Sequence, residues 1–230
     1  MSLLWSDEFE GPAGTPPDAR RWEHELGPGG NGELQAYTRE NAVLDGRGNL
    51  AITAAPDRTS ARIRTKGRFD FTYGRIEARV RVPRGTGLWP AVWALGADID
   101  EAGWPACGEI DVMEHVGQEP RRAFGTIHCP GHAHPHGFQG GVDLDEDLAG
   151  GFHVFAADWR PQRIEWSVDG RAYHAATPAD VPGGWVFDHP FYLLVNLALG
   201  GDLGGELQAD LPQALLVDYV RVFSPTAREP

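Results

Sequence analysis

The residues with the clearest chemical potential lie in the segment GEIDVMEHV, residues 108–116, where three acids occur within six positions. Strict alternation along a strand would place Glu109 and Asp111 on one face but would point Glu114 into the core. A buried, unpaired carboxylate is strongly penalised. One extra residue at Val112–Met113, a β-bulge, returns Glu114 to the acid face. The spacing therefore predicts a bulged strand with three carboxylates on one side.

Paired carboxylates of this kind are typical of glycoside hydrolysis. A retaining glycosidase holds its two carboxyl groups about 5 Å apart, whereas an inverting enzyme leaves roughly 6.5 to 9.5 Å for a water. The Cα atoms of Glu109 and Glu114 would be on the order of 13 Å apart along a strand, a gap that two inward-leaning side chains can close. Asp111 between them would raise the pKa of one glutamate and keep it protonated as the acid. The alternative is an edge strand with a solvated acid face.

The elements that must position these acids read as strands. Apolar and polar residues alternate in segments separated by Gly, Pro and Asp turns, and no amphipathic helix of three turns stands out. The sequence therefore predicts an all-β fold, a sandwich of two antiparallel sheets, in one catalytic domain over residues 1–230 with a frayed tail at 224–230. The expected strands cover residues 49–53, 75–82, 109–116, 152–159, 163–169, 191–199 and 215–223.

One expected strand, RIEARVRV at residues 75–82, has a charged face. Its apolar residues alternate with Arg75, Glu77, Arg79 and Arg81. This face is either a solvated outer surface or a polar concave surface that carries a ligand. The charges alone leave both interpretations open.

The overall composition favours a compact domain and an uncharged ligand. The 30 Gly and 18 Pro indicate many turns, and the net charge is -13. Such a chain offers no basic field to nucleic acid or to an anionic membrane, so we expect neither as a partner. No run of about 18 apolar residues is present, and the start MSLLWSDEF lacks the features of a signal peptide. These residues therefore do not indicate the cellular compartment of the protein.

The two cysteines, Cys107 and Cys129, flank the acid strand and its expected partner. If residues 109–115 and 123–127 form a hairpin, the cysteines come within about one residue of facing each other. They form either a cross-strand disulfide or two buried thiols. Because a cross-strand disulfide demands tight geometry, both alternatives remain open.

Several aromatic side chains surround the acid segment. Trp89 and Trp93 are spaced by four in GLWPAVWALG, and Trp104 precedes the acid strand. Indole faces stack on pyranose rings, so these tryptophans are candidates for sugar subsites. For any one of them, packing in the core is the alternative.

The loop HAHPHG contains His132, His134 and His136 at alternating positions. Zinc would need three or four convergent ligands with supporting partners, and Pro135 in a Gly-rich loop argues against such convergence. We expect a mobile loop that borders the cleft.

The segment GEIDVMEHVG resembles the active-site signature of glycoside hydrolase family 16 in its bulged, laminarinase-like form. This resemblance implies a concanavalin-like β-jelly-roll with a substrate cleft on its concave sheet, and endo-hydrolysis with retention of anomeric configuration. Further stretches resemble that family in order along the chain: residues 5–11, 31–38, 66–96, 125–131, 152–159, 196–201 and 217–223.

By position, the resemblance implies that Glu109 is the nucleophile, Asp111 its modulating partner and Glu114 the acid/base. The bulged motif with Met113 resembles that of β-1,3-glucanases, so laminarin-type β-glucan is the expected substrate, with mixed β-1,3-1,4-glucan as a secondary one. The positions that match sugar-contacting residues are Asn31, Glu77, Arg79 and Asn196, and with the resemblance Trp89, Trp93 and Trp104 are expected in the cleft. His128, on the expected partner of the acid strand, either hydrogen-bonds substrate or Glu114 or is a structural histidine satisfied by the backbone.

The resemblance also implies a structural calcium ion, held by the backbone carbonyls of Glu8 and Gly46 and by Asp218. Catalysis by two carboxylates needs no metal or other cofactor. We expect a secreted protein, because a polymer that cannot enter a cell is cut outside it, and a monomer.

Two other functions fit the same fold, since a fold does not fix a function. The first is a lectin-like sugar-binding module, which does not explain why Glu109 and Glu114 occur together. The second is an enzyme of the same family that acts on agarose or xyloglucan, or that transfers sugars to an acceptor.

Overall fold

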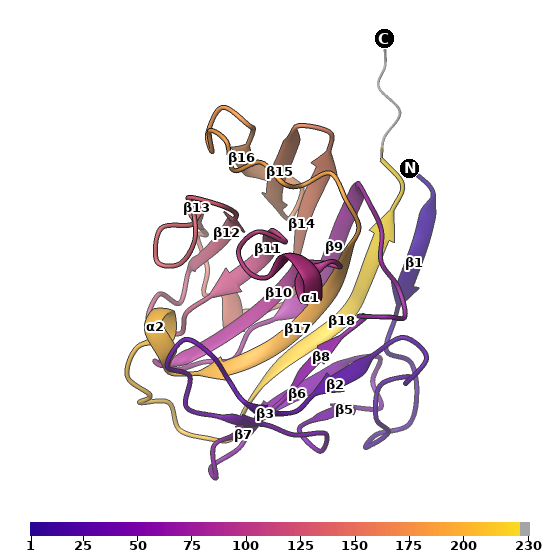
Figure 1. Cartoon of the computed structure of the whole chain (residues 1–230). Coiled ribbons are helices and arrows are strands. Elements are labelled where there is room, and N and C mark those ends of the chain that lie inside the picture. The colour runs from indigo at the N-terminus through magenta and orange to yellow at the C-terminus, as the bar shows by residue number, and fades with distance from the viewer. Residues whose placement is uncertain (226–230) are drawn as a thin grey trace.

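The computed structural model describes residues 1–225 and contains two antiparallel sheets (Figure 1). The eight-stranded sheet has the order β16-β15-β14-β9-β18-β6-β5, with β1 also paired to β18. Its strands are β1 (Leu3–Asp7), β5 (Ala42–Leu44), β6 (Leu50–Ala54), β9 (Gly74–Arg81), β14 (His153–Arg160), β15 (Arg163–Val168), β16 (Arg171–Ala176) and β18 (Gln213–Phe223).

The seven-stranded sheet has the order β13-β12-β11-β10-β17-β8-β2. Its strands are β2 (Glu23–Glu25), β8 (Arg62–Arg64), β10 (Leu88–Gly96), β11 (Glu109–His115), β12 (Arg122–His128), β13 (Phe138–Asp143) and β17 (Phe191–Leu199). A small third sheet and three single-turn helices complete the fold: β3 (Gly27–Pro28), β4 (Ala36–Tyr37), β7 (Thr59–Ser60), α1 (Ile99–Ala102), the 3-10 helix Leu148–Gly150 and α2 (Gly201–Gly204). The predicted all-β jelly-roll sandwich is confirmed, and each expected strand is present.

A continuous apolar core lies between the sheets. The strand β9 alternates buried and half-buried residues, with Ile76, Ala78 and Val80 fully buried. In the other layer, every residue of β17 is buried. The Trp166 indole spans the two layers, because its Nε1 donates a 2.7 Å hydrogen bond to the backbone oxygen of Asp111. The core therefore fixes the backbone of the acid strand directly.

The charged face of β9 turns away from the acid strand. β9 lies in the eight-stranded sheet between β14 and β18, where the Tyr219 hydroxyl donates to Glu77 at 2.9 Å and Arg79 pairs with Asp218. The interpretation of this face as an outer surface is therefore the right one. The assignment of Glu77 and Arg79 to substrate binding is corrected, because acid and β9 residues belong to different sheets.

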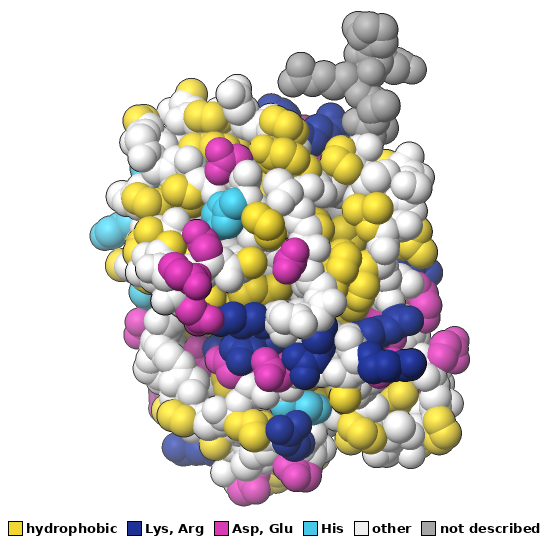
Figure 2. All heavy atoms as spheres, turned by 45° about the vertical axis from the view of Figure 1, so that its right-hand side comes forward, with side chains coloured by type: hydrophobic (Ala, Val, Ile, Leu, Met, Phe, Trp, Pro, Cys, Tyr) yellow, Lys and Arg dark blue, Asp and Glu magenta, His cyan; other side chains and the backbone are white. Residues whose placement is uncertain are grey.

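Basic side chains on the surface are interleaved with acidic ones. Figure 2 shows one face on which Lys and Arg side chains form a band with Asp and Glu side chains among them. Pairs of this kind include Arg64 with Glu23 at 2.8 Å and with Glu25 at 2.9 Å, and Lys66 with Asp100 at 2.7 Å. Basic groups with such close acidic neighbours present little net positive field to an anionic ligand.

The ends of the described chain are tied together. The Ser2 backbone amide donates to the Ser224 hydroxyl at 2.9 Å, and the Ser224 amide donates to the Ser2 carbonyl at 2.8 Å. Pairing thus continues into the first residue of the tail that was expected to fray, while residues 226–230 lie outside the described part. Within residues 1–225, no helix has the length and apolar character needed to cross a membrane.

The two cysteines are free thiols, both buried. Because Glu109 pairs with His128, the position opposite Cys107 is one residue beyond Cys129. An offset of one residue turns two side chains to opposite faces of a sheet. Accordingly, Cys129 packs in the main core and Cys107 in a small separate cluster with Tyr192. Burial raises the pKa of each thiol to about 11.

A glycine on β12 makes room for the tryptophan that spans the layers. A Cβ at Gly125 would lie 2.4 Å from Cδ1 of Trp166, which is fully buried. We expect Gly125→Ala to lower the free energy of unfolding by about 1–3 kcal/mol, because a packed core resists added volume. Urea denaturation measures this change. Gly150→Ala is the matched control, since an added Cβ there meets no heavy atom within 4 Å. Equal stabilities for the two variants would contradict this account of the packing.

Candidate active site

The predicted bulge is present in β11. The pairing of β11 with β12 shifts by one residue between Asp111 and Glu114, and its pairing with β10 shifts between Asp111 and Met113. Val112 and Met113 are fully buried in the core. The extra residue therefore keeps both apolar side chains inside while Glu109, Asp111 and Glu114 line one cavity, as the spacing predicted.

This cavity has a volume of about 420 Å³ and is lined by residues of the seven-stranded sheet and of the loops around it. Of the residues predicted from the sequence, it brings together Asn31, Trp89, Trp93, Trp104, Glu109, Asp111, Glu114, His128 and Asn196. Glu77 and Arg79 do not line it. Their absence from the lining agrees with the position of β9 in the other sheet.

Glu109 is held by the loop that precedes β11. The Trp104 indole donates a 2.8 Å hydrogen bond from Nε1 to Oε2 of Glu109. Burial raises the pKa of Glu109 to about 7, and the nearby charge of Glu114 adds to the rise, while the Trp104 hydrogen bond opposes it. Glu109 is therefore ionised near neutral pH only because hydrogen-bond donors such as Trp104 lower its pKa.

Asp111 has the poorest set of partners of the three acids. Its Oδ2 is buried and has no hydrogen bond to any of residues 1–225. Burial raises its pKa well above the ordinary value, and the charges of Glu114 and Glu109 raise it further. Asp111 is thus the acid that keeps a proton most readily, and it shares a hydrogen bond with Glu109.

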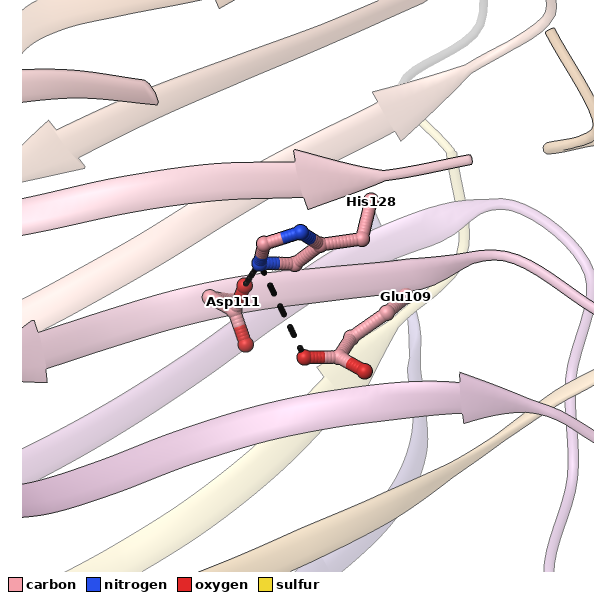
Figure 3. A group of neighbouring side chains, drawn as sticks. All are labelled: Glu109, Asp111 and His128. Atoms are coloured by element: carbon pink, nitrogen blue, oxygen red, sulfur yellow. Dashed lines mark ion pairs between the residues drawn. The ribbon is translucent and has the colours of Figure 1, made fainter. Parts of the chain in front are cut away.

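His128 faces two of the acids from β12, as Figure 3 shows. Its Nε2 lies 3.5 Å from Oδ2 of Asp111 and 4.0 Å from Oε1 of Glu109. Burial lowers the pKa of His128 to about 4, and His134 lowers it further. The imidazole is therefore neutral at pH 7 and adds no positive charge to the acid cluster.

Glu114 accepts two hydrogen bonds. The Trp89 indole donates to Oε1 at 3.1 Å and the Thr126 hydroxyl donates to Oε2 at 3.0 Å. The Gln139 amide in turn donates to the Thr126 oxygen at 3.2 Å, which fixes the direction of that hydroxyl. Burial raises the pKa of Glu114, and both donors oppose the rise. Its orientation is thus set by two neighbouring strands.

The opposite part of the cavity is a polar network. The Trp93 indole donates to the Asn196 amide oxygen at 2.8 Å, and the Asn196 amide nitrogen donates to the Tyr37 hydroxyl at 3.3 Å. The Tyr37 hydroxyl donates to Glu33 at 2.8 Å, and the Arg62 guanidinium lies 4.5 Å from the Tyr37 ring centre. These hydrogen bonds fix the edge of the Trp93 indole. They also hold polar side chains, among them Asn196 and Glu33, on the cavity wall.

The sequence interpretation missed several cavity residues: Glu33, Arg62, Thr126, Gln139 and Asp202. His134, from the loop expected to border the cleft, does line the cavity. Thr126 and Gln139 matter because they orient Glu114. The available signal was the expected hairpin partner of the acid strand, whose register places Thr126 opposite Asp111. Polar residues on that partner strand were therefore candidates from the sequence.

One group of side chains has the spacing of a metal site. The ligand atoms of Glu109, Asp111 and His128 all lie within 4.8 Å of one another. These are the carboxylates that acid/base and nucleophilic chemistry require, and that chemistry needs no metal. Within residues 1–225, the side chains of His132, His134 and His136 do not form a comparable group.

The expected calcium ligands lie in three neighbouring segments of the eight-stranded sheet and its turns. Asp7 pairs with Val220, so Glu8 and Asp218 are close in register. Gly46 follows β5 in the turn to β6, and β6 is the neighbour of β18. The three segments are thus placed where oxygen ligands from each can approach one another.

The two acidic members of this set already have cationic partners. The Glu8 carboxylate accepts hydrogen bonds from Arg221 at 3.0 and 2.7 Å, and the Asp218 carboxylate pairs with Arg79. A calcium ion bound here would therefore take mainly backbone carbonyls as ligands. A direct bond from the Asp218 side chain would require that the Arg79 pair open.

The Trp104 indole controls the charge of Glu109, the expected nucleophile. A hydrogen bond to a carboxylate favours its charged form, so Trp104→Phe should raise the pKa of Glu109 above about 7. Because the nucleophile must be ionised, we expect the acidic limb of the kcat/KM profile to move to higher pH. Trp185→Phe, at a tryptophan that does not line the cavity, is the control. An acidic limb that stays in place or moves to lower pH would refute this role.

Comparison with known proteins gives one consistent result. The family model described as Glycosyl hydrolases family 16 matches residues 31–220. A β-glucanase of Rhodothermus marinus is 41% identical, over 96% of this chain and 84% of its own length. The catalytic domain of an endo-1,3-β-glucanase (laminarinase) from Thermotoga petrophila superposes with a TM-score of 0.91 at 38% identity, with 98% of each chain covered. The endo-β-1,3-glucanase from Pyrococcus furiosus gives a TM-score of 0.91 at 41% identity, over 98% of this chain and 95% of that one.

Proposed function

Because this chain belongs to glycoside hydrolase family 16, we propose that it cuts internal β-1,3-glucosidic bonds of laminarin-type β-glucan with retention of configuration. The observation that carries the proposal is the bulged strand β11, which directs the buried Asp111 and Glu114 and the half-buried Glu109 into one cavity. A sugar-binding module has no use for such an arrangement, since buried acids with raised pKa values are costly.

The arrangement supports a double displacement. Glu109 attacks the anomeric carbon while Glu114 gives its proton to the departing glycosidic oxygen, so that one C–O bond forms as the other breaks. A water then attacks the glycosyl-enzyme, Glu114 takes the water's proton, and the Glu109 carboxylate is released. Protonated Asp111 stabilises the charged form of Glu109 through their shared hydrogen bond. The Trp104 indole does the same from the other side.

The cavity wall suits an uncharged sugar. Trp89, Trp93 and Trp104 line it, and each has its indole nitrogen bonded to an acid or amide of the site. Each indole edge is therefore fixed, so its face can pack on a pyranose ring. The fixed amide of Asn196 can select the orientation of a sugar hydroxyl.

The function is tested by the release of reducing ends from laminarin, lichenan, agarose and xyloglucan. We expect laminarin to be cut fastest, lichenan second, and Glu114→Gln to lose most activity on each, at least about 100-fold, because general acid catalysis is removed. Proton NMR of the first product should show retained configuration. Faster cleavage of another glycan would change the substrate, and binding of glucan without any release would favour the lectin alternative.

We also propose that a calcium ion binds at the edge formed by β1, β18 and the β5–β6 turn, with Glu8 and Gly46 contributing carbonyl oxygens and Asp218 a further oxygen. Support comes from the resemblance and from the close register of Glu8 and Asp218. Oxygen ligands from separate segments suit calcium, and the ion would tie the N-terminal strand to the sheet. Its role is stability, not catalysis.

The calcium proposal predicts a change in thermal stability. Calcium at 100 times its Kd should stabilise the fold by about 2.7 kcal/mol, so Tm should rise relative to protein in EDTA. Asp218→Ala should lessen the rise, because it removes the one side-chain oxygen of the set, whereas Mg²⁺, which demands a stricter octahedral geometry, should reproduce little of it. Calorimetry in calcium, magnesium and EDTA measures these shifts. Identical Tm values with calcium and with EDTA would rule out the site.

We further propose that the enzyme works outside the cell as a monomer. The support for the first statement is chemical, because its polymeric substrate does not enter cells. Assay of cell-free medium from the native source, and light scattering of the purified protein, test the two statements.

A further inference from the structure

The HAHPHG loop has no part in the mechanism above, yet it contacts the far wall of the cavity. His134 lies in the loop between β12 and β13, and its Nε2 is 3.1 Å from Oδ2 of Asp202 in α2. Figure 1 shows α2 beside this loop. Both residues line the cavity that contains the three acids.

The two segments start from different strands of the seven-stranded sheet. β12 and β17 are separated by β11 and β10, so they are about 14 Å apart at a spacing of roughly 4.8 Å per strand. The C-terminal ends of the two strands also lie at opposite ends of the sheet along the strand direction. β12 ends at His128, which pairs with Glu109, whereas β17 ends at Leu199, near Trp89. The contact between His134 and Asp202 therefore joins segments on either side of β11, which carries the acids, and β10, which carries Trp89 and Trp93.

Further contacts hold both of these segments close to the sheet. A Cβ on Gly137 would lie 2.5 Å from the His128 ring, so the base of the loop rests on the acid-bearing face. At the other end, the Asp202 amide donates to the Asn31 carbonyl at 2.9 Å. His134 also lowers the pKa of Glu114, which places it near the catalytic acid.

The pair itself is only partly shielded from water. The side chains of His134 and Asp202 are 32% and 56% exposed. Polar contacts between side chains with this exposure contribute little to stability, so the two segments can separate at small cost. A weak contact such as that between His134 and Asp202 suits two segments that separate when substrate enters the cleft.

We propose that His134 and Asp202 form a strap over the cleft, and that this strap determines the preference of the enzyme between polymer and short oligosaccharide. An internal segment of a long glucan has no free end nearby, so it reaches the acids only when the pair opens. A short oligosaccharide enters from the end of the cleft beneath the closed pair. The inference rests on the proposed function for its substrates.

The test compares kcat/KM on a polymer with kcat/KM on its hexasaccharide, using the glycan that wild type cuts fastest. We expect Asp202→Ala to raise the ratio of polymer to hexasaccharide activity by about 3-fold or more, because the strap no longer closes. Asp202→Asn, which keeps an oxygen acceptor but loses the charge, should give an intermediate ratio. Asp210→Ala is the control, since it removes an exposed acid from the same segment after β17.

A second variant closes the strap permanently. In His134→Cys with Asp202→Cys, dibromobimane links the two thiols and fluoresces only when both have reacted, while the native Cys107 and Cys129 are buried. The linked protein should lose polymer activity by about 10-fold or more relative to the same unlinked protein, and should keep its hexasaccharide activity. An unchanged ratio in both Asp202→Ala and the linked protein overturns the strap. If wild type cuts none of the glycans, the proposed function is overturned instead. The strap is then tested by the ratio of the binding rates of polymer and hexasaccharide, measured in the same variants.

Discussion

The structure depends on placing three carboxyl groups, two buried and one half-buried, on one face of a single strand. A strand that strictly alternates cannot place Glu109, Asp111 and Glu114 on one face, and a buried acid on the core side would cost several kcal/mol. The bulge at Val112–Met113 resolves this conflict by inserting one residue. The backbone at the bulge then needs support from the core, which the Trp166 indole gives by donating to the Asp111 carbonyl.

The three acids differ because their donors differ. Glu109 and Glu114 each accept an indole hydrogen bond, and Glu114 accepts a hydroxyl as well, whereas Oδ2 of Asp111 has no partner among the described residues. With neutral His128 beside them, the acids share protons without a compensating cation. A proton is thus kept at the centre of the group, on Asp111, and this leaves one flanking glutamate free to ionise as the other stays protonated.

Much of this could be predicted from the sequence, because the period of two and the spacing of the acids are local signals. The strands and the bulge followed from them directly. What local signals do not contain is which sheet a strand joins. They left the charged face of β9 open, and the resemblance assigned Glu77 and Arg79 to the cleft although β9 lies in the other layer. Register is equally hidden: an offset of one residue separated Cys107 from Cys129. Thr126, by contrast, lies on the expected hairpin partner of the acid strand and was a candidate from the sequence.

The paired strands and the connecting segments contribute different side chains to the site. The catalytic acids and Thr126 lie on paired strands whose backbone hydrogen bonds leave little freedom, so the chemistry is built on the rigid part of the fold. Trp104, His134 and Asp202 come from connecting segments and are partly exposed, and loops vary and move more than strands. The reaction is therefore determined by β11 and its neighbours, whereas the choice among glucans depends on side chains that can change or separate without disturbing the carboxylates.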